Sequence, residues 1–421
     1  MSRFPPRPAP ILAYYLYQAT DSVGFIWPVF TLFLLWKDLT YTQIGTLGAI
    51  SALLVVAFEV PTGYVADRFG RRNALALGMA AMTASVAGFV VVDSFTGFVV
   101  LYAIWSIALS LQSGTADAWL YETLRDRTDE ETFTRVRGRG GSVHHWVSAA
   151  TMIAGGLLYV GHPTYPFVAS AFLHGIGVVV VLSMPANAQF DRSSPTETVG
   201  VRESLSILRT RFSNPSLRAF VLFVALFFAL VSVADTYVQP ITVDVLAGID
   251  PMRSIAGPTV PEEATLGVVY AGFAALSAIA SYYAESVRDL FGLRTALLAL
   301  PVAIAGLFLT PLVLGLLAIP VFFCMKGATA LYRPLVNQYL NDRVESVGRA
   351  TLLSAASMGY ALVRAPLKPV AGYLADLTSP IVLLAAIGAG FVVVAVTMVV
   401  LASPVPAIGT AESSAPRPDV D

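Results

Sequence analysis

Charged residues inside long apolar segments are the first candidates for chemistry in this sequence. The acidic ones are Asp21, Glu59, Asp117, Glu122, Asp235 and Asp244, and the basic ones are Lys326, Arg333, Arg364 and Lys368. A charge in an apolar medium is costly unless it pairs with an opposite charge or faces a cavity. Each of these positions therefore predicts either a function or a partner.

Two interpretations fit the four basic residues. In the first, they form a cationic wall that binds an acidic group of a ligand, with Arg333 and Arg364 the best candidates because a guanidinium pairs with a carboxylate through two bonds. Lys326, Lys368 and Asp235 are candidates for the same site. In the second, Asp235, Asp244 or Glu59 neutralises the bases in structural ion pairs. The sequence leaves both interpretations open.

Asp21, Glu59 and Asp117 are candidates for proton uptake and release. A carboxyl group in a low-dielectric medium holds its proton more tightly, which brings its titration toward neutral pH. Asp21 lies deepest in its apolar segment and is favoured. Asp117 and Glu122 lie near the end of theirs, where solvent is the alternative partner.

The sequence predicts no metal site and no cofactor. His144 and His145 are adjacent, so they do not share one helical face as a pair of metal ligands would. Cys324 is the only cysteine, which excludes an intrachain disulfide and a cysteine metal cluster. Neither a GxxxxGK[ST] loop for nucleotides nor an HExxH helix is present.

The composition assigns the chain to the membrane. Of 421 residues, 56% are hydrophobic and 13% are charged, whereas soluble proteins carry about 25% charged residues. The net charge of -1 predicts no nucleic-acid partner. Helices that cross a bilayer need about 20 apolar residues, and the sequence predicts twelve, with Pro311, Gly315 and Pro320 dividing the ninth from the tenth. Their ranges are 11–36, 42–64, 73–92, 97–122, 141–161, 165–184, 218–247, 264–284, 295–317, 319–341, 350–375 and 380–402.

Positive charge predicts the orientation and the domains. With the N-terminus inside, only Lys37 and Arg253 of the 26 Lys and Arg residues lie in outer loops, and four lie within spans. Because basic loops stay in the cytoplasm, both termini are expected there, in a multi-pass protein of the cell membrane. The predicted organisation is a six-helix bundle at 1–184, a cytoplasmic linker at 185–217, a second six-helix bundle at 218–402 and a disordered tail at 403–421.

An internal repeat supports two similar halves. QATDSVGFIWP in the first span resembles SVADTYVQP in the seventh, and ADRFGRRNALALG at 66–78 resembles AESVRDLFGLRTALLAL at 284–300. The matching segments occur in the same order in both halves. Parallel repeats of six helices are typical of carriers that bind a solute between the halves, near the middle of the membrane.

The stretch GYVADRFGRR lies in the inner loop between the second and third spans. It resembles the signature of the major facilitator superfamily, G-x-x-x-D-R-x-G-R-[RK], through Gly63, Asp67, Arg68, Gly70, Arg71 and Arg72. The glycines allow a tight turn between helices. The resemblance covers essentially the whole chain and implies an all-α membrane fold of twelve helices in two bundles related by a pseudo-twofold axis. It also implies that the charged residues of this motif act as an inner gate that holds the two halves together in one state; the alternative is that Arg71 and Arg72 only set the orientation.

The family resemblance sharpens the interpretation of the buried charges. In that fold spans one, four, seven and ten line the central cavity, and spans three, six, nine and twelve face outward; the charges here avoid the outward set almost completely. Proton-driven antiporters of the family carry an arginine in span four and GPxxGG in span five. This chain has Ser110 in SLQSG and the sequence TMIAGG, so a drug/proton antiporter is disfavoured.

The function implied is a secondary transporter of a small organic solute, working by alternating access as a monomer without ATP. The basic residues favour an anionic substrate, and proton coupling is left open. The alternatives are an efflux carrier for lipophilic cations or drugs, and a protein of the same fold that senses a ligand without moving it. An intramembrane enzyme is disfavoured because no nucleophile with a placed base is present.

Overall fold

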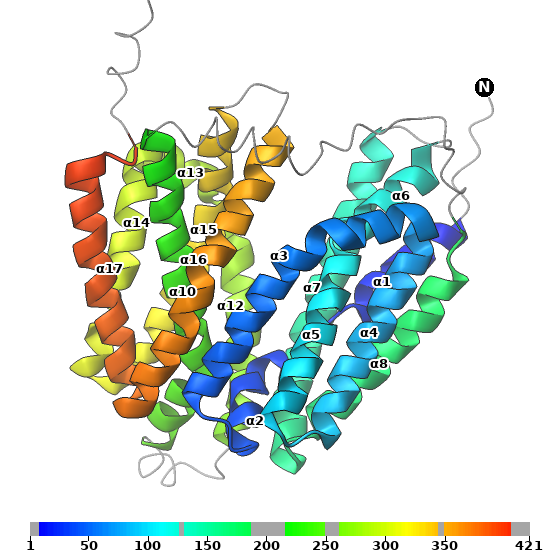
Figure 1. Cartoon of the computed structure of the whole chain (residues 1–421), viewed down its shortest axis with the longest axis horizontal. Coiled ribbons are helices and arrows are strands. Elements are labelled where there is room, and N and C mark those ends of the chain that lie inside the picture. Colours follow the sequence, from blue (N-terminus) through cyan, green and yellow to red (C-terminus); the bar gives the residue numbers. More distant parts are fainter. Residues whose placement is uncertain (1–7, 126–129, 187–214, 249–260, 344–348, 406–421) are drawn as a thin grey trace, which may run out of the picture. The chain divides into compact units, whose positions relative to one another are not determined.

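The computed structural model of the chain describes residues 8–125, 130–186, 215–248, 261–343 and 349–405. These residues form helices and contain no strand, which confirms the all-α prediction (Figure 1). The predicted linker and tail lie almost entirely outside the described residues. Several arginines on which the predicted orientation depends, such as Arg3 and Arg192, also lie outside them.

The chain forms two compact units. Unit 1 comprises Met1–Thr196, Thr236–Ala275 and Ala365–Pro380, and unit 2 comprises Glu197–Asp235, Leu276–Arg364 and Ile381–Asp421. Unit 1 therefore combines the first half of the chain with segments of three later helices. Those segments matter below because they supply contacts that the first half does not make by itself.

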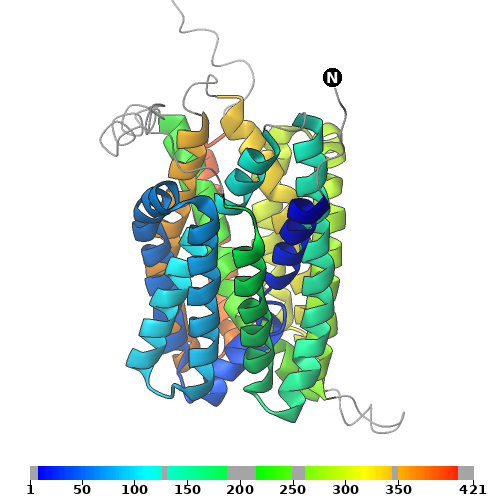
Figure 2. The ribbon, with the colours of Figure 1, turned by 90° about the vertical axis from the view of Figure 1, so that its right-hand side faces the viewer.

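Unit 1 holds the helices of the first half. In chain order these are α1 (Pro8–Thr20), η1 (Trp27–Val29), α2 (Phe30–Trp36), α3 (Tyr41–Phe69), α4 (Arg71–Val91), α5 (Phe95–Gln112), α6 (Thr115–Arg125), α7 (Glu130–Gly161) and α8 (Tyr165–Ser183). Helix α4 packs against α5 and α8, and α1 packs against α7 and α8 (Figure 2).

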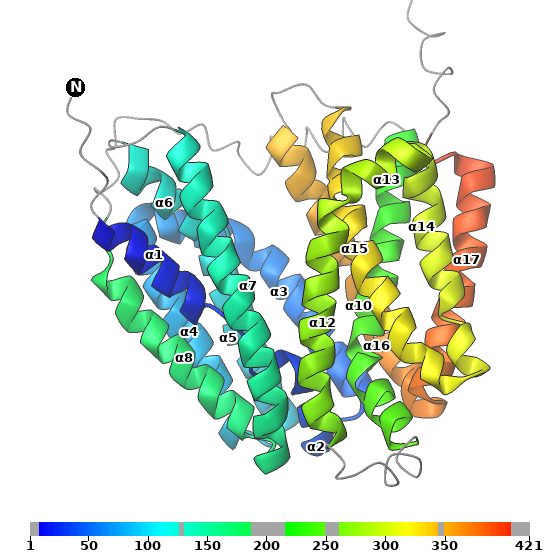
Figure 3. The ribbon, with the colours of Figure 1, turned by 180° about the vertical axis from the view of Figure 1, so that it is seen from behind.

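Three helices contribute to both units, and the others of the second half belong to unit 2. The shared helices are α10 (Pro215–Ala247), α12 (Glu262–Tyr282) and α16 (Arg349–Leu377). Unit 2 also holds α13 (Ala284–Phe291), α14 (Leu293–Leu307), η2 (Thr310–Leu312), η3 (Gly315–Leu317), α15 (Ala318–Asn341) and nearly all of α17 (Pro380–Ala402). Helices α14 and α15 lie side by side (Figure 3).

Nine helical segments of the described residues are long and apolar enough to cross a membrane. They correspond to nine of the expected spans, and the predicted cut between the ninth and tenth is confirmed, since α14 ends at Leu307 and α15 begins at Ala318. The other three expected spans are helical, but 11–36 is interrupted and α7 and α16 are more polar. The count of twelve stays a prediction.

The first expected span differs most from its prediction. Helix α1 ends at Thr20, and η1 begins only at Trp27. Pro28 lacks an N–H and its ring clashes with the carbonyl four residues earlier, which disfavours one continuous helix. Tight packing against α7 accompanies the break: a Cβ on Gly24 would lie 2.7 Å from the Ser148 carbonyl oxygen, and one on Gly155 would lie 2.0 Å from that of Phe25.

The second repeat pair has the same backbone geometry in both halves. Gly70 ends α3 and begins α4 with φ +89°, and Gly292 ends α13 and begins α14 with φ +77°. Only glycine adopts this region without strain. The predicted role of glycine in the turn is therefore confirmed for Gly70 and wrong for Gly63, which lies inside α3 because the helix continues to Phe69.

An aromatic core fixes α2 against the rest of unit 1. Phe33, Phe89, Phe98 and Phe167 are all fully buried. The rings of Phe33 and Phe167 have centroids 3.9 Å apart, and those of Phe89 and Phe167 are 5.6 Å apart. Aromatic pairs at these separations add to the burial energy. The short segment formed by η1 and α2 is thereby held by packing, although the break after Thr20 separates it from α1.

Close backbone approach joins α3 to α16 and α7 to α12, all within unit 1. A Cβ on Gly372 would lie 2.2 Å from the Tyr41 carbonyl oxygen, and one on Gly45 would lie 2.3 Å from that of Lys368. On α7, a Cβ on Gly156 would lie 2.9 Å from the carbonyl oxygen of Glu263. Small residues at helix crossings permit such approach in membrane proteins, where dispersion contacts drive association.

We predict that Gly372→Ala destabilises the protein. The added methyl group would overlap backbone atoms of α3, which move only with the helix, so the free energy of unfolding should fall by about 1–3 kcal/mol. Unfolding of the purified protein in detergent measures the change. Gly390→Ala is the matched control because a Cβ there meets no atom within 4 Å. Equal stabilities of the two variants would contradict the prediction.

Candidate functional site

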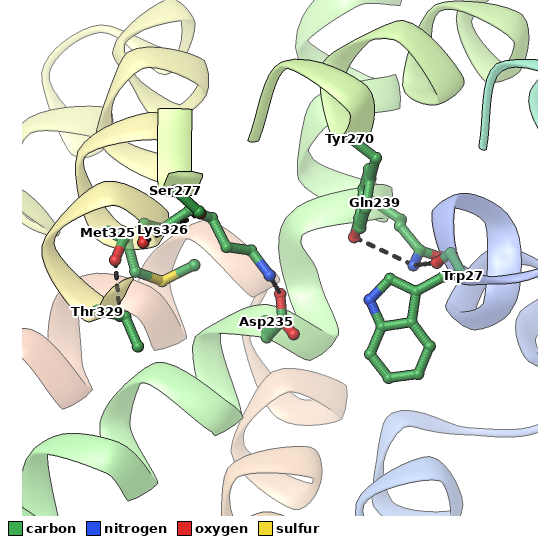
Figure 4. Close-up of polar contacts among 8 residues, drawn as sticks. All are labelled: Trp27, Asp235, Gln239, Tyr270, Ser277, Met325, Lys326 and Thr329. Atoms are coloured by element: carbon green, nitrogen blue, oxygen red, sulfur yellow. Dashed lines mark hydrogen bonds and ion pairs between the residues drawn. The ribbon is translucent and has the colours of Figure 1, made fainter. Parts of the chain in front are cut away.

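The Asp235 carboxylate of α10 forms an ion pair with the Lys326 ammonium group of α15 (Figure 4). Both side chains are partly buried, with 28% and 20% of their surface exposed. Asp235 lies within a continuous helix, unlike Asp21 at the corresponding place in the first half. One of the expected bases thus has an acidic partner inside unit 2, as the structural interpretation of the sequence anticipated.

Arg333 of α15 and Arg364 of α16 both lie near an aromatic pair formed by Phe228 and Tyr360. Arg364 follows Tyr360 by one helical turn on α16. The Arg333 guanidinium lies 5.5 Å from the ring centre of Phe228 on α10, and that ring lies 5.3 Å from the ring of Tyr360. We call these four residues the arginine cluster. All of them belong to unit 2.

The arginine cluster contains hydrogen-bond donors that lack acceptors. The Arg364 Nε atom and the Tyr360 hydroxyl are enclosed, and neither has a hydrogen-bond partner among the described residues. Neither arginine forms an ion pair with any residue for which the structure gives side-chain contacts. Buried polar groups are normally paired, so these two donors are among the few exceptions in the described residues.

Lys368 lies one helical turn beyond Arg364 on α16. It belongs to unit 1 and packs against α3, where a Cβ on Gly48 would lie 3.1 Å from its Nζ atom. The four bases of the expected wall therefore have three environments: an ion pair for Lys326, a helix contact for Lys368 and the arginine cluster.

The three candidate proton carriers also differ from one another. Asp21 is half-buried just beyond α1, where the Tyr17 hydroxyl donates a hydrogen bond of 3.3 Å to Oδ2. Glu59 is exposed on α3. Asp117 accepts two hydrogen bonds from Arg137 of α7, at 2.8 Å from Nε and 2.7 Å from Nη2. A bidentate pair of this kind fixes the carboxylate of α6 against α7.

The GYVADRFGRR motif fastens helices of unit 1 to one another. Arg71 pairs with Asp67 at 3.0 Å and donates to Glu122 of α6 at 3.1 Å. Arg72 donates to the carbonyl oxygen of Met184, the residue that ends α8. Arg68 donates to the hydroxyl of Tyr64, one turn earlier on α3. These contacts give the motif a structural role within unit 1, and its role as an inner gate stays a prediction.

Gln239 of α10 binds the start of α2, a contact that the sequence did not predict. Its Oε1 atom accepts hydrogen bonds from the backbone N–H of Thr31 at 2.7 Å and of Leu32 at 3.3 Å, at the start of α2. Its Nε2 atom donates to the Trp27 carbonyl at 2.8 Å and to the Tyr270 hydroxyl at 3.2 Å (Figure 4). Trp27 and Gln239 each precede a proline in the repeated segments, so repeat-related positions meet here.

Asp376, near the end of α16, makes a second connection of the same kind. Its carboxylate accepts hydrogen bonds of 2.8 Å from the backbone N–H groups of Tyr41 and Thr42 and one of 2.6 Å from the Thr42 hydroxyl. Thr40 and Gln43 satisfy the next backbone groups through a capping box. The backbone N–H groups of Tyr41, Thr42 and Gln43 at the start of α3 therefore all have side-chain acceptors. Although partial burial raises it, the pKa of Asp376 is lowered overall by these hydrogen bonds.

Gln239 and Asp376 differ in how far the sequence alone could have identified them. Gln239 is a polar residue in an apolar helix and sits in the repeat directly before Pro240, so the repeat comparison could have identified it. Asp376 lies one residue beyond a predicted span, where a charged residue needs no special explanation. Its partner is separated from it by more than 300 residues, and no local pattern reports such a contact.

We predict a pH-dependent loss of stability for Asp376→Asn. The lowered pKa means that the contact contributes fully above about pH 4, the ordinary value of an aspartate, and is lost as the pH falls through the folded-state value. The variant should be less stable by about 0.5–1 kcal/mol, a modest cost because the carboxylate is exposed. Melting temperatures of both proteins between pH 3 and pH 8 test this.

The control is Asp38→Asn, which removes an equal charge just before α3 at a side chain with no recorded hydrogen bond. The difference between Asp376→Asn and the parent should be constant from pH 5 to pH 8 and should shrink at lower pH. A difference that disappears near neutral pH would show that the carboxylate is not held in its ionised form.

We also predict energetic coupling between Asp235 and Lys326. Asp235→Asn removes the carboxylate that neutralises the ammonium group. This single variant should lose more stability than the double variant that also carries Lys326→Gln. A coupling energy of roughly 1–3 kcal/mol is expected for a partly buried pair. Unfolding of the parent, both single variants and the double variant measures it, and additive effects would refute it.

Comparison with known proteins identifies the fold and the family. The sequence model of the Major Facilitator Superfamily matches residues 12–355. An uncharacterized MFS-type transporter, YxaM of Bacillus subtilis (strain 168), is 25% identical over 193 residues, which cover 44% of this chain and 47% of that protein. The match thus spans about half of the relative's length.

Solved structures of transporters share the fold across nearly the whole chain. The nucleoside transporter NupG matches with a TM-score of 0.76 at 12% identity, covering 94% of this chain and 99% of NupG. A bacterial homologue of the human lysosomal transporter Spinster matches with 0.66 at 17% identity (94% and 95% covered), and a D-xylose–proton symporter with 0.61 at 14% identity (93% and 96%). The chain therefore belongs to the major facilitator superfamily, a family of secondary membrane transporters.

Proposed function

We propose that the protein transports a small organic anion and that Arg333 and Arg364 bind its anionic group. One observation carries the proposal: the Arg333 guanidinium lies over Phe228, whose ring contacts Tyr360 one turn before Arg364. Among the described residues, no acid forms an ion pair with either arginine. Arg364 is half-buried, and a positive charge in such a place is unfavourable unless an anion compensates it. A carboxylate or phosphate would accept the donors of Arg364 and Tyr360 that have no partner among the described residues.

The remaining bases have other roles in this proposal. Lys326 and Asp235 form a neutral pair that joins α10 to α15. Lys326 precedes Arg333 on α15, and Asp235 follows Phe228 on α10. Lys368 supports the packing of α16 on α3. The substrate site is therefore narrower than the wall expected from the sequence, and it consists of the two arginines with Phe228 and Tyr360.

Asp21 is the candidate for proton coupling that the contacts support best. It is half-buried beside a break in the first span, and its recorded side-chain partner is the neutral Tyr17 hydroxyl. Asp117, by contrast, is engaged by Arg137 through two hydrogen bonds. Because Arg137 occupies both carboxylate oxygens of Asp117, we assign Asp117 to structure and Asp21 to proton coupling.

The bundles 1–184 and 218–402 are proposed to rock about this site. The protein is proposed to lie in the cell membrane, with both termini in the cytoplasm. The GYVADRFGRR motif then lies at the cytoplasmic end of α3. Asp376 binds the opposite end of the same helix. Opening toward the outside would require the bonds of Asp376 and Gln239 to break, because each joins a helix of the first half to one of the second.

Ligand-dependent thermal stability tests the proposed substrate class. The purified protein is heated in detergent with benzoate, succinate, inorganic phosphate, a neutral sugar, a nucleoside or tetraphenylphosphonium. A ligand present at 100 times its Kd stabilises the folded state by about 2.7 kcal/mol, so at least one anion should raise the melting temperature. Arg364→Ala should abolish that shift, and Arg294→Ala, which removes an exposed arginine outside the cluster, should keep it.

The outcomes separate the candidate functions. If tetraphenylphosphonium alone stabilises the protein, the efflux of lipophilic cations replaces the present proposal. If an anion stabilises the parent and Arg364→Ala equally, the anion binds elsewhere and the role of the cluster is refuted. An anion that binds but is not taken up into proteoliposomes containing the protein would favour a ligand sensor.

A further inference from the structure

The helices α14 and α17 lie next to each other in unit 2 (Figure 3), and a groove runs between them at the end where α14 begins and α17 ends. It has a volume of about 430 Å³ and is lined by aliphatic side chains, among them Leu298, Val302, Val396 and Val400, with Arg294 at one end. From Arg294 to Val302 the helix advances by about 12 Å, at 1.5 Å per residue. The apolar core of one bilayer leaflet is about 15 Å thick, so the groove fits within one leaflet.

The surface around this groove is suited to lipid and not to water. Helix α17 contains no ionisable residue and is long enough to cross a membrane. Its residues Val396, Val400 and Leu401 are 52%, 71% and 80% exposed. Aliphatic side chains on the outside of such a helix are covered by acyl chains. Because a cavity lined by aliphatic groups stays dry, an acyl chain is the occupant that matches the walls of the groove.

Arg294 gives the groove one charged end. It is the only ionisable residue of α14 and α17. Its Nε atom donates to the Val405 carbonyl oxygen at 2.9 Å, and the described residues supply no recorded acceptor for its Nη1 and Nη2 atoms. A guanidinium group binds phosphate oxygens through two such donors. The Thr295 hydroxyl also lines the groove and can donate to the same phosphate.

The first half of the chain shows which acceptor Arg294 lacks. Arg72 is its counterpart in the repeat, and it likewise donates to a carbonyl oxygen just beyond a helix, that of Met184 after α8. Asn73 accepts hydrogen bonds from the Nε and Nη2 atoms of Arg72, at 3.3 and 3.2 Å. Thr295 stands in the place of Asn73. The second half therefore keeps the carbonyl contact but leaves the other donors of its arginine to a ligand.

We propose that an anionic phospholipid binds this groove, with its phosphate on Arg294 and Thr295 and one acyl chain along the aliphatic walls. The positive charge of the arginine and the negative charge of the phosphodiester cancel. Among the described residues, no carboxylate lines the groove. The ammonium group of a zwitterionic headgroup would therefore find no partner there and would repel Arg294. Basic pockets between membrane-spanning helices bind anionic headgroups by the same principle.

The site lies outside the arginine cluster, and the inference goes beyond the proposed function. Farther along the same two helices, backbone contact joins them, since a Cβ on Gly388 would lie 2.4 Å from the Ala305 carbonyl oxygen. At the groove, this contact gives way to space for a chain. A lipid in that space packs against both helices. It stabilises unit 2, because a ligand that binds the folded state shifts unfolding by mass action.

Lipid titration tests the class of lipid. The purified protein in dodecyl maltoside is titrated with phosphatidylglycerol, phosphatidylethanolamine or phosphatidylcholine of the same acyl chains, and Kd values are taken from native mass spectrometry and from thermal shifts. Phosphatidylglycerol should bind at least about tenfold more tightly than the two zwitterionic lipids, as one favourable charged contact implies. Equal binding of the three lipids would overturn the anionic assignment.

Variants locate the phosphate and the chain. Arg294→Gln keeps a polar side chain without the charge, so the affinity for phosphatidylglycerol should fall about tenfold, to that of phosphatidylcholine. Val396→Phe adds bulk to the groove at an exposed position. It should weaken binding of all the lipids and leave the melting temperature of the lipid-free protein unchanged. Arg218→Gln, which removes an exposed arginine of α10 that does not line the groove, is the matched control and should change no affinity.

The remaining outcomes exclude other occupants. Glycerol 3-phosphate carries the phosphate without acyl chains, so an equal thermal shift with this compound would show that the site binds a soluble phosphate, and the lipid assignment would be wrong. Binding of phosphatidylglycerol that survives Arg294→Gln or Val396→Phe would place the lipid elsewhere and overturn the inference. None of these measurements involves the arginine cluster, so a failure here leaves the proposed function intact.

Discussion

Two helix N-termini from the first half of the chain take their hydrogen-bond acceptors from side chains of the second half. Gln239 serves the start of α2 and Asp376 the start of α3. The first N–H groups of a helix have no partner within it, and here side chains from distant helices supply acceptors for some of them. The glycine contacts between α3 and α16 bring the backbones close enough for this, so close packing and polar bonding support each other at the same place.

The helical class, most span positions and the turn at Gly70 were predictable because they depend on local patterns. Apolar runs of sufficient length, broken by charged or proline-rich stretches, are properties of neighbouring residues. The division of 295–341 at Pro311 and Gly315 is an example, since both residues disfavour a continuous helix. The break after Thr20 escaped prediction because the apolar run continues across it. It became visible only through the packing of Gly24 and Phe25 against α7, which the local sequence does not report.

The site was only partly predictable, and the reason is physical. Hydrophobicity reveals that a charge is costly, but not whether a partner on another helix compensates it. Asp117, Lys326 and Arg364 were all candidates as charges within spans, yet among the described residues the first two have ion-pair partners and the third has none. Partners such as Arg137 lie on helices whose crossing positions depend on the whole fold. The signs of the charges were informative all the same, because the excess of bases in α15 and α16 agrees with the lack of an acidic partner for Arg333 and Arg364 among the described residues.

The adjacent residues Gly155 and Gly156 on α7 have a mechanical consequence. Successive residues of a helix point about 100° apart around its axis, and here one faces the Phe25 carbonyl beside the broken first span while the other faces α12. Rotation of α7 in either direction would replace one of these backbone contacts by a side chain that does not fit. The two contacts therefore oppose rotation of α7 about its own axis. It remains free to separate from them along the direction in which the glycines face, so any rearrangement at this place must proceed by parting of helices rather than by rolling.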